Sequence, residues 1–151
     1  GIYGVVGGQC VDIEIENSDS VNDDVIDFVN EHKTACMIES SLMTGAILAG
    51  ADSEYISRLE EAGSCLGKAF QIRDDILNVT GTEKELGKSI GSDSDEGKRN
   101  YVSLHGPDDA QNKVTELTSH AVSVFDELYR LRGIEYAFLS ELSERMTTRR
   151  K

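Results

Sequence analysis

The chain contains a single proline, Pro107, among its 151 residues. Proline makes up about 5% of average sequences, and its scarcity here removes the residue that most often breaks a helix. Apolar residues recur at helical spacing along most of the chain, and no stretch of four to eight residues alternates as a half-buried strand would. The sequence therefore predicts an all-α fold.

The predicted helices differ in character. A helix over residues 53–79 carries one apolar stripe, whereas residues 36–51 are apolar on nearly all sides, as in a buried helix. A helix beginning at Pro107 has acidic residues in its first turn and Gly133 after its end, which are favourable at the two helix termini. Its expected apolar face includes Leu131. Shorter helices are predicted over residues 2–16, 21–32 and 134–149.

Residues 80–105 interrupt this pattern. The segment holds four glycines and little periodic apolar content. A loop of this length within a compact domain is uncommon unless it is functional or disordered.

Charge and cysteine content exclude several classes of protein. The net charge of −13 leaves no basic surface for nucleic acid or anionic membrane, and no window approaches the ~20 apolar residues of a membrane span. The three cysteines, Cys10, Cys36 and Cys65, form no C-x-x-C pair. They favour a reduced, cytoplasmic setting over a disulfide scaffold or a zinc ribbon.

The strongest functional signal lies in one predicted helix. At spacings i, i+3, i+4 and i+7, one helical face carries Gln71, Asp74, Asp75 and Asn78. Adjacent carboxylates in an apolar helix repel each other unless a cation compensates, and oxygen ligands without His or thiolate suit Mg²⁺. The pattern indicates a magnesium site. A surface stripe, in which Arg73 pairs with a neighbouring acid, is the alternative.

Two lysines follow glycines in the 80–105 segment, at Gly87-Lys88 and Gly97-Lys98. The glycine spacing fits neither a P-loop nor an EF-hand. Flexible turns that bring two ammonium groups toward a carboxylate face would suit Mg²⁺ with a polyphosphate. A further polar step, Lys33-Thr34, indicates by itself a linker in which Thr34 caps the next helix.

Several short motifs occur in the order found in one known family. The longest is Phe70-Gln71-Ile72-x-Asp74-Asp75, followed by Leu86-Gly87-Lys88 and Gly97-Lys98-x-x-Tyr101. Before it stand Gly7-Gly8-Gln9-x-x-Asp12, Lys33-Thr34 and Gly45-Ala46-Ile47-Leu48-Ala49-Gly50. Together they resemble the C-terminal half of the trans-isoprenyl diphosphate synthases, the polyprenyl synthetase family. The resemblance implies that residues 1–151 are the C-terminal part of one helical bundle around a central cavity, with residues 80–105 as an active-site loop.

The resemblance also implies an activity. The full-length protein is expected to be a Mg²⁺-dependent prenyltransferase that condenses an allylic diphosphate with isopentenyl diphosphate into a short-chain all-trans product, farnesyl or geranylgeranyl diphosphate. We expect a cytoplasmic homodimer with no nucleic-acid partner and no membrane span. The 151 residues lack the family's first aspartate-rich motif, so alone they are expected to be inactive. The alternative is a non-catalytic subunit of a heteromeric prenyl synthase.

Roles for individual residues follow from the same resemblance. The expected metal site consists of Asp74, with Asp75 and Asn78 in support. Catalytic roles, as contacts to the allylic diphosphate or as dipoles toward the cation, are expected for Lys33, Thr34, Gln71, Lys88 and Lys98. Substrate-binding roles are expected for Phe70, Arg149, Arg150 and Lys151. Two positions depart from the family pattern: Asn78 replaces an aspartate, and Asn100 stands where a threonine commonly precedes Tyr101.

Overall fold

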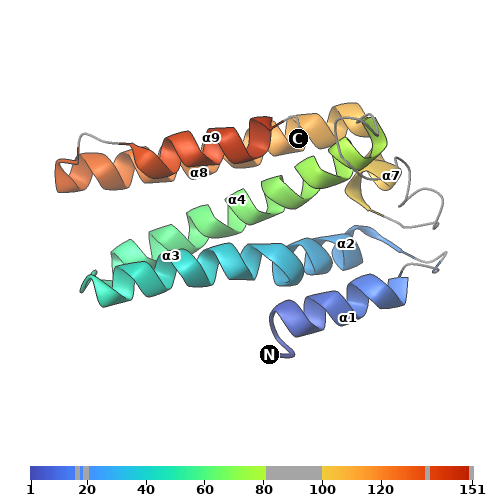
Figure 1. Cartoon of the computed structure of the whole chain (residues 1–151), viewed down its shortest axis with the longest axis horizontal. Coiled ribbons are helices and arrows are strands. Elements are labelled where there is room, and N and C mark those ends of the chain that lie inside the picture. Colours follow the sequence, from blue (N-terminus) through green and yellow to red (C-terminus); the bar gives the residue numbers. More distant parts are fainter. Residues whose placement is uncertain (16–17, 19–20, 81–99, 135–136, 150–151) are drawn as a thin grey trace.

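The computed structural model describes the chain over residues 1–15, 18, 21–80, 100–134 and 137–149. Within these stretches every regular element is helical (Figure 1), which confirms the predicted all-α fold. The elements are α1 (Val5–Ile15), α2 (Asp23–Val29), η1 (Asn30–Ala35), α3 (Cys36–Leu48), α4 (Ser53–Thr80), α7 (Tyr101–His105), α8 (Pro107–Arg132) and α9 (Phe138–Thr148).

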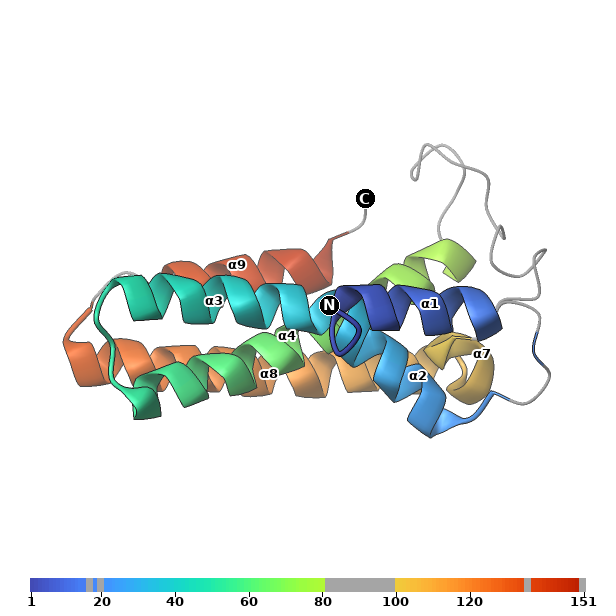
Figure 2. The same ribbon diagram turned by 90° about the horizontal axis from the view of Figure 1, so that it is seen from below.

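Helix α4 is the centre of the bundle. It packs between α3 and α8, while α9 lies along α8 and α1 lies against η1 (Figures 1 and 2). The main core lies between α3, α4 and α8 and consists of Ala46, Leu59, Ala62, Leu66, Ala121, Val124, Phe125 and Leu128. A second core supports the C-terminal half of α4 and consists of Ala69, Ile72, Ile76, Val102, Ala110 and Val114. This second core holds the predicted site helix in place.

The two long helices begin and end close to the predicted positions. Helix α4 exceeds its prediction by one residue. Helix α8 has Pro107 in its first turn and ends at Gly133, whose φ of 64° is the left-handed conformation that favours glycine at a helix end. Leu131, which was expected on the apolar face of α8, is 69% exposed, so that assignment is wrong.

Helices α2, η1 and α3 follow one another without a break, so the Lys33-Thr34 step lies inside a helix. The expected linker with Thr34 as N-cap is wrong. The segment is a π-helical turn, a form with i→i+5 hydrogen bonds that occurs frequently at functional sites. A Cβ atom on Gly8 would lie 2.4 Å from the Lys33 backbone nitrogen, and one on Gly67 would lie 2.3 Å from the Ala35 Cα atom. The backbones of α1 and α4 therefore lie directly against the backbone of the π-helical turn.

Helix α3 is not the buried helix that its composition predicts. Ala46 is its one buried residue, and Met37, Ile47 and Leu48 are exposed. The reason is that α3 packs along α4 with a single face, which uses Ile38 and Leu42. The opposite face of α3 has no neighbouring helix among the described residues.

Helix α9 begins at Phe138, four residues later than predicted. The Leu139 backbone N–H in its first turn donates to the Tyr129 hydroxyl oxygen of α8 at 2.7 Å, a tertiary contact that satisfies one free donor of the helix terminus. Helix α1 also starts later than predicted, because the chain before it folds back until the Ile2 carbonyl approaches Gly7.

The predicted loop over residues 80–105 is partly helical at its end. Residues 81–99 lie outside the described residues, but Tyr101–His105 form α7. Asn100 caps this helix, because its side chain accepts a hydrogen bond from the Ser103 backbone N–H at 3.0 Å while the Asn100 N–H donates to the Ser103 hydroxyl at 2.9 Å. Threonine is also a favoured N-cap, so asparagine at this position keeps a residue type that suits a cap.

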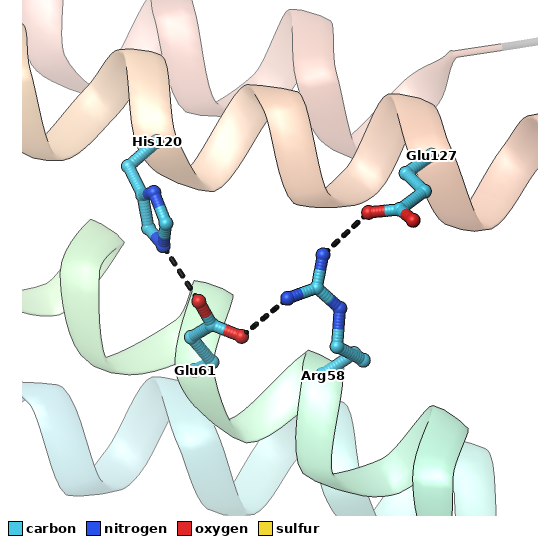
Figure 3. A network of polar contacts seen from close by, with 4 residues as sticks. All are labelled: Arg58, Glu61, His120 and Glu127. Carbon is cyan, nitrogen blue, oxygen red and sulfur yellow. Dashed lines mark hydrogen bonds and ion pairs between the residues drawn. The ribbon is translucent and has the colours of Figure 1, made fainter.

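A polar network joins the exposed edges of α4 and α8 (Figure 3). Arg58 donates to Glu61 and to Glu127, and the His120 Nε2 atom lies 2.7 Å from the other carboxylate oxygen of Glu61. The hydrogen bond from His120 and the nearby Arg58 guanidinium hold the pKa of Glu61 below its ordinary value.

Two observations concern the classes that the sequence disfavours, disulfide scaffolds and membrane-spanning proteins. Cys10, Cys36 and Cys65 are free, and burial raises the pKa of the Cys36 and Cys65 thiols. In the part of the chain that the structure describes, none of the helices combines the length and apolar character required to cross a membrane.

Candidate active site

The face of α4 that carries Gln71, Asp74, Asp75 and Asn78, here called the carboxylate–amide face, contains both buried and solvent-exposed side chains. Asp75 and Asn78 are 6% and 8% exposed, and the Gln71 Nε2 atom lies 3.4 Å from the Asp75 Oδ1 atom. Asp74 lies at the open side, with a side chain that is 42% exposed. The face therefore presents one accessible carboxylate above a buried carboxylate and amide.

The π-helical turn η1 carries two predicted site residues, Thr34 and Lys33, which contact different helices. The Thr34 hydroxyl donates to the Gln71 Oε1 atom at 2.8 Å, so it contacts α4 directly. The neighbouring Lys33 ammonium lies 2.6 Å from the Asp12 Oδ2 atom of α1. Consecutive residues thus tie η1 to α4 and to α1.

Asp12 is a site residue to which the sequence analysis assigned no role. It is 6% exposed, and it carries the charge that neutralises Lys33. Its position offered a signal: Asp12 follows Gly8 by four residues, so both share one face of α1, the face that packs against the Lys33 backbone. A carboxylate one turn from a close-packed glycine is expected to be buried and paired.

At the other end of the face, Arg149, the residue that follows α9, reaches across to α4. Its NH2 atom donates to the Asp74 Oδ1 atom at 2.7 Å, and its guanidinium carbon lies 4.2 Å from the centre of the Phe70 ring. Arg73 donates through Nε and NH2 to the Arg149 carbonyl at 3.2 and 2.9 Å, and to Gln111 at 2.8 Å. Among the acids of this face, Asp74 pairs with Arg149.

The donor set fits a hard cation. Mg²⁺ is usually held by one or two carboxylates, with waters and substrate phosphates completing its coordination. Asp74 offers an accessible carboxylate, which pairs with the Arg149 guanidinium. The described residues contain no cluster of three or more His, Cys, Asp or Glu side chains that could hold an ion, so this face provides only part of a coordination shell.

Four predicted site residues are not placed. Lys88, Lys98, Arg150 and Lys151 lie outside the described residues. The residues that the structure does bring together are Thr34 with Gln71, Phe70 and Asp74 with Arg149, and Gln71 with Asp75.

The geometry defines an all-helical protein whose longest helix presents a carboxylate–amide face beside cationic side chains. The family model described as "Polyprenyl synthetase" matches residues 1–130. This chain therefore belongs to the polyprenyl synthetase family, as its motifs predict.

Several known proteins are similar to the chain. It is 39% identical over 121 residues to a chloroplastic geranylgeranyl pyrophosphate synthase of Capsicum annuum, a match that covers 80% of this chain and 33% of the relative. It is 41% identical over 114 residues to the farnesyl diphosphate synthase of Bacillus subtilis, covering 76% of this chain and 38% of the relative. The chain spans little more than a third of the length of these relatives.

The fold is shared with solved prenyl synthases. The Helicobacter pylori geranyltransferase complexed with magnesium and isoprenyl diphosphate matches with a TM-score of 0.77 and 33% identity, over 97% of this chain and 46% of that one. A Corynebacterium glutamicum geranylgeranyl pyrophosphate synthase matches with a TM-score of 0.82 and 26% identity, over 97% and 52% of the two chains. The described helices thus form part of the isoprenyl synthase fold.

Proposed function

We propose that these residues are the C-terminal portion of a Mg²⁺-dependent prenyltransferase that condenses an allylic diphosphate with isopentenyl diphosphate. The expected product is a short-chain all-trans prenyl diphosphate, farnesyl or geranylgeranyl diphosphate. The observation that carries the proposal is the carboxylate–amide face of α4. On this face Asp74 is accessible and pairs with Arg149, while Asp75 and Asn78 are buried. Relatives named geranylgeranyl and farnesyl diphosphate synthases support it.

In this proposal Asp74 would hold the metal, with Asp75 and Asn78 in support, mostly through water. When bound, Mg²⁺ supplies charge neutralisation to the diphosphate oxygens and favours departure of pyrophosphate. A neighbouring structure complexed with magnesium and isoprenyl diphosphate supports this choice of cation. The amide at position 78 keeps an oxygen donor but lacks the charge of aspartate.

The cationic side chains act on the leaving group. Cleavage of the allylic C–O bond leaves both bonding electrons on the diphosphate oxygen, and Lys33 stabilises that negative charge electrostatically. Lys88 and Lys98 are proposed to contact the same diphosphate. Lys33 is available for this role on a side chain that keeps about a quarter of its surface exposed, and Asp12 orients it.

The Thr34–Gln71 pair and Phe70 serve the organic part of the substrates. Oxygen dipoles of Thr34 and Gln71 would stabilise the allylic cation, supported by their mutual hydrogen bond of 2.8 Å. Phe70 is proposed to border the isopentenyl pocket, with Arg149 and the following Arg150 and Lys151 near its diphosphate. The contact between Arg149 and the Phe70 ring supports placing both at one subsite.

The full-length protein is proposed to be a homodimer that uses α1. This helix exposes large apolar side chains at near-helical spacing on one face, which an isolated helix leaves in contact with water. They are Val6 and Ile13, which are seven residues apart; Ile2, in the turn before α1, is exposed as well. A cytoplasmic location is part of the proposal and is supported by the three free cysteines.

The test compares two variants of the full-length protein. Asp74→Asn removes the proposed metal ligand, and Glu60→Gln neutralises an exposed carboxylate elsewhere on α4. We expect Asp74→Asn to reduce Mg²⁺-dependent condensation at least a hundredfold, since the metal carries the leaving-group charge, while Glu60→Gln remains close to the parent. Undiminished condensation by Asp74→Asn would contradict the proposal, as would product formation by the 151 residues alone.

A non-catalytic subunit of a heteromeric prenyl synthase is the second candidate. Asn78 in place of an aspartate and a relative named as the large subunit of a heterodimeric geranylgeranyl pyrophosphate synthase favour considering it. Retention of Asp74, Asp75, Lys88 and Lys98 in the sequence weighs against it. Condensation that occurs only after a partner chain is added to the purified full-length protein would favour this candidate.

A further inference from the structure

Arg149 is held on α4 by three residues within five positions of each other. Its guanidinium binds the Asp74 carboxylate at 2.7 Å and covers the Phe70 ring at 4.2 Å. Its backbone carbonyl accepts two hydrogen bonds from Arg73. Phe70, Arg73 and Asp74 are spaced i, i+3 and i+4, so one patch of the α4 surface receives both the side chain and the backbone of Arg149.

The side-chain contact is incomplete. The Arg149 Nε atom is buried, and no hydrogen-bond partner for it lies among the described residues. A buried N–H of a charged group that makes no hydrogen bond loses its hydration without replacement, which weakens the state that contains it. The backbone carbonyl, by contrast, is doubly satisfied by Arg73. The backbone of Arg149 is thus the firm attachment and its guanidinium the weaker one.

We propose that the Arg149 guanidinium and a divalent cation compete for the Asp74 carboxylate. This inference rests on the proposed role of Asp74 as metal ligand. A dication at either carboxylate oxygen would lie within a few ångströms of the guanidinium, and like charges at that separation repel each other. Metal binding therefore displaces the guanidinium, while Arg73 keeps the backbone in place.

The displacement has a consequence for anion binding. In the structure the charge of Arg149 is neutralised by Asp74. Once a cation takes its place, the guanidinium is free to bind an anionic group beside Phe70, and a guanidinium binds phosphate oxygens through paired N–H donors. The metal then binds before the anion, because it releases the arginine that the anion needs.

The test measures binding of Mn²⁺, a stand-in for Mg²⁺ that is visible by electron paramagnetic resonance, to the full-length protein. Arg149→Gln removes the competing charge. Arg145→Gln is the matched control, because Arg145 is an exposed arginine one turn earlier on α9 and makes no contact with Asp74. We expect Arg149→Gln to tighten Mn²⁺ binding about fivefold or more, in the usual range for coupled sites, and Arg145→Gln to change it less than about twofold.

A second measurement follows Arg149 directly. In protein labelled with ¹⁵N-arginine, the Nε–H resonance that disappears in Arg149→Gln belongs to this side chain, and Mg²⁺ is expected to shift it and to speed its exchange with water. Equal Mn²⁺ affinities of the two arginine variants, or weaker binding by Arg149→Gln, would overturn the inference.

Asp74→Asn distinguishes this failure from failure of the proposed function. If Asp74→Asn removes a Mn²⁺ site that Arg149→Gln leaves unchanged, only the competition is wrong. If Asp74→Asn leaves Mn²⁺ binding intact, Asp74 is no metal ligand, and both the metal assignment and the competition are wrong.

Discussion

The ammonium of Lys33, on the π-helical turn, lies 2.6 Å from the Asp12 Oδ2 atom of α1. Asp12 is buried and Lys33 is partly exposed, so the pair lies at the boundary between core and solvent. The contact joins two elements that also meet at Gly8. It fixes the position of a side chain whose proposed task is to bind diphosphate.

Replacing Asp12 should therefore destabilise the protein. Removing one partner of a fully buried ion pair costs about 3–5 kcal/mol. For Asp12→Asn we expect about 2 kcal/mol, because Lys33 can regain some hydration. Urea denaturation measures this loss, and Glu14→Gln, an exposed acid on the same helix, is the control. An additional Lys33→Met change should recover part of the loss, and purely additive effects would contradict the pairing.

Replacement by alanine is expected to have opposite effects at two helical glycines, one in the contact between α4 and η1 and one in open space on α3. In Gly67→Ala the new Cβ atom would lie 2.7 Å from the Ala35 Cβ atom, and such overpacking costs about 1–3 kcal/mol. Gly45→Ala on α3 meets nothing within 4 Å and should stabilise by about 0.5–1 kcal/mol through helix propensity. Thermal denaturation of the two variants checks both signs. A neutral Gly67→Ala would show that the helices can separate without cost.

The N-cap of α7 predicts a graded series at one position. Asn100→Ala removes the acceptor of the Ser103 N–H bond and should cost about 1 kcal/mol, whereas Asn100→Thr keeps an oxygen at the cap and should cost less. Amide hydrogen exchange over residues 101–105 reports the local effect. Equal losses for the two variants would contradict the capping role.

The network of Figure 3 predicts a pH-dependent effect of Glu61. Its pKa is lowered in the folded state, so its stabilising contribution is present above the ordinary pKa of a glutamate, about 4.3, and disappears as the pH falls through the lower, folded value. Glu61→Gln should thus lower the free energy of unfolding near neutral pH, by less than about 1 kcal/mol for exposed pairs. The difference from the parent should shrink below about pH 4. A difference that persists unchanged in acid would contradict the role of its charge, and Glu60→Gln is the control.

The sequence contained most of the information about the helices and much less about their contacts. Local signals decide where α8 begins and ends, since Pro107 and Gly133 act through their own backbone preferences. The π-helical turn is different, because no residue in 30–35 demands it and it depends on Gly8 and Gly67, which are distant in the chain. The exposure of α3 also depends on which helices surround it, a property that composition does not encode.

The same division applies to the candidate site. Helical spacing alone predicts that Gln71, Asp74, Asp75 and Asn78 share a face. The partners of that face come from other elements, Thr34 from η1 and Arg149 from the end of α9. Periodicity within one helix carries no information about such long-range pairs, and for this reason Asp12 was missed as the partner of Lys33.

The π-helical turn also bears on how this helix tolerates changes in length. A π-helical turn holds one residue more than the α-helical turn it replaces, so deleting one residue within 30–35 can restore α-helix while α2 and α3 keep their orientation. A deletion within α3 itself would rotate the following residues by about 100° and turn Ala46 away from α4. Variants with one residue deleted in the turn are therefore expected to fold. The deletion would displace Lys33 and Thr34, so these variants are expected to lose activity while they keep the fold.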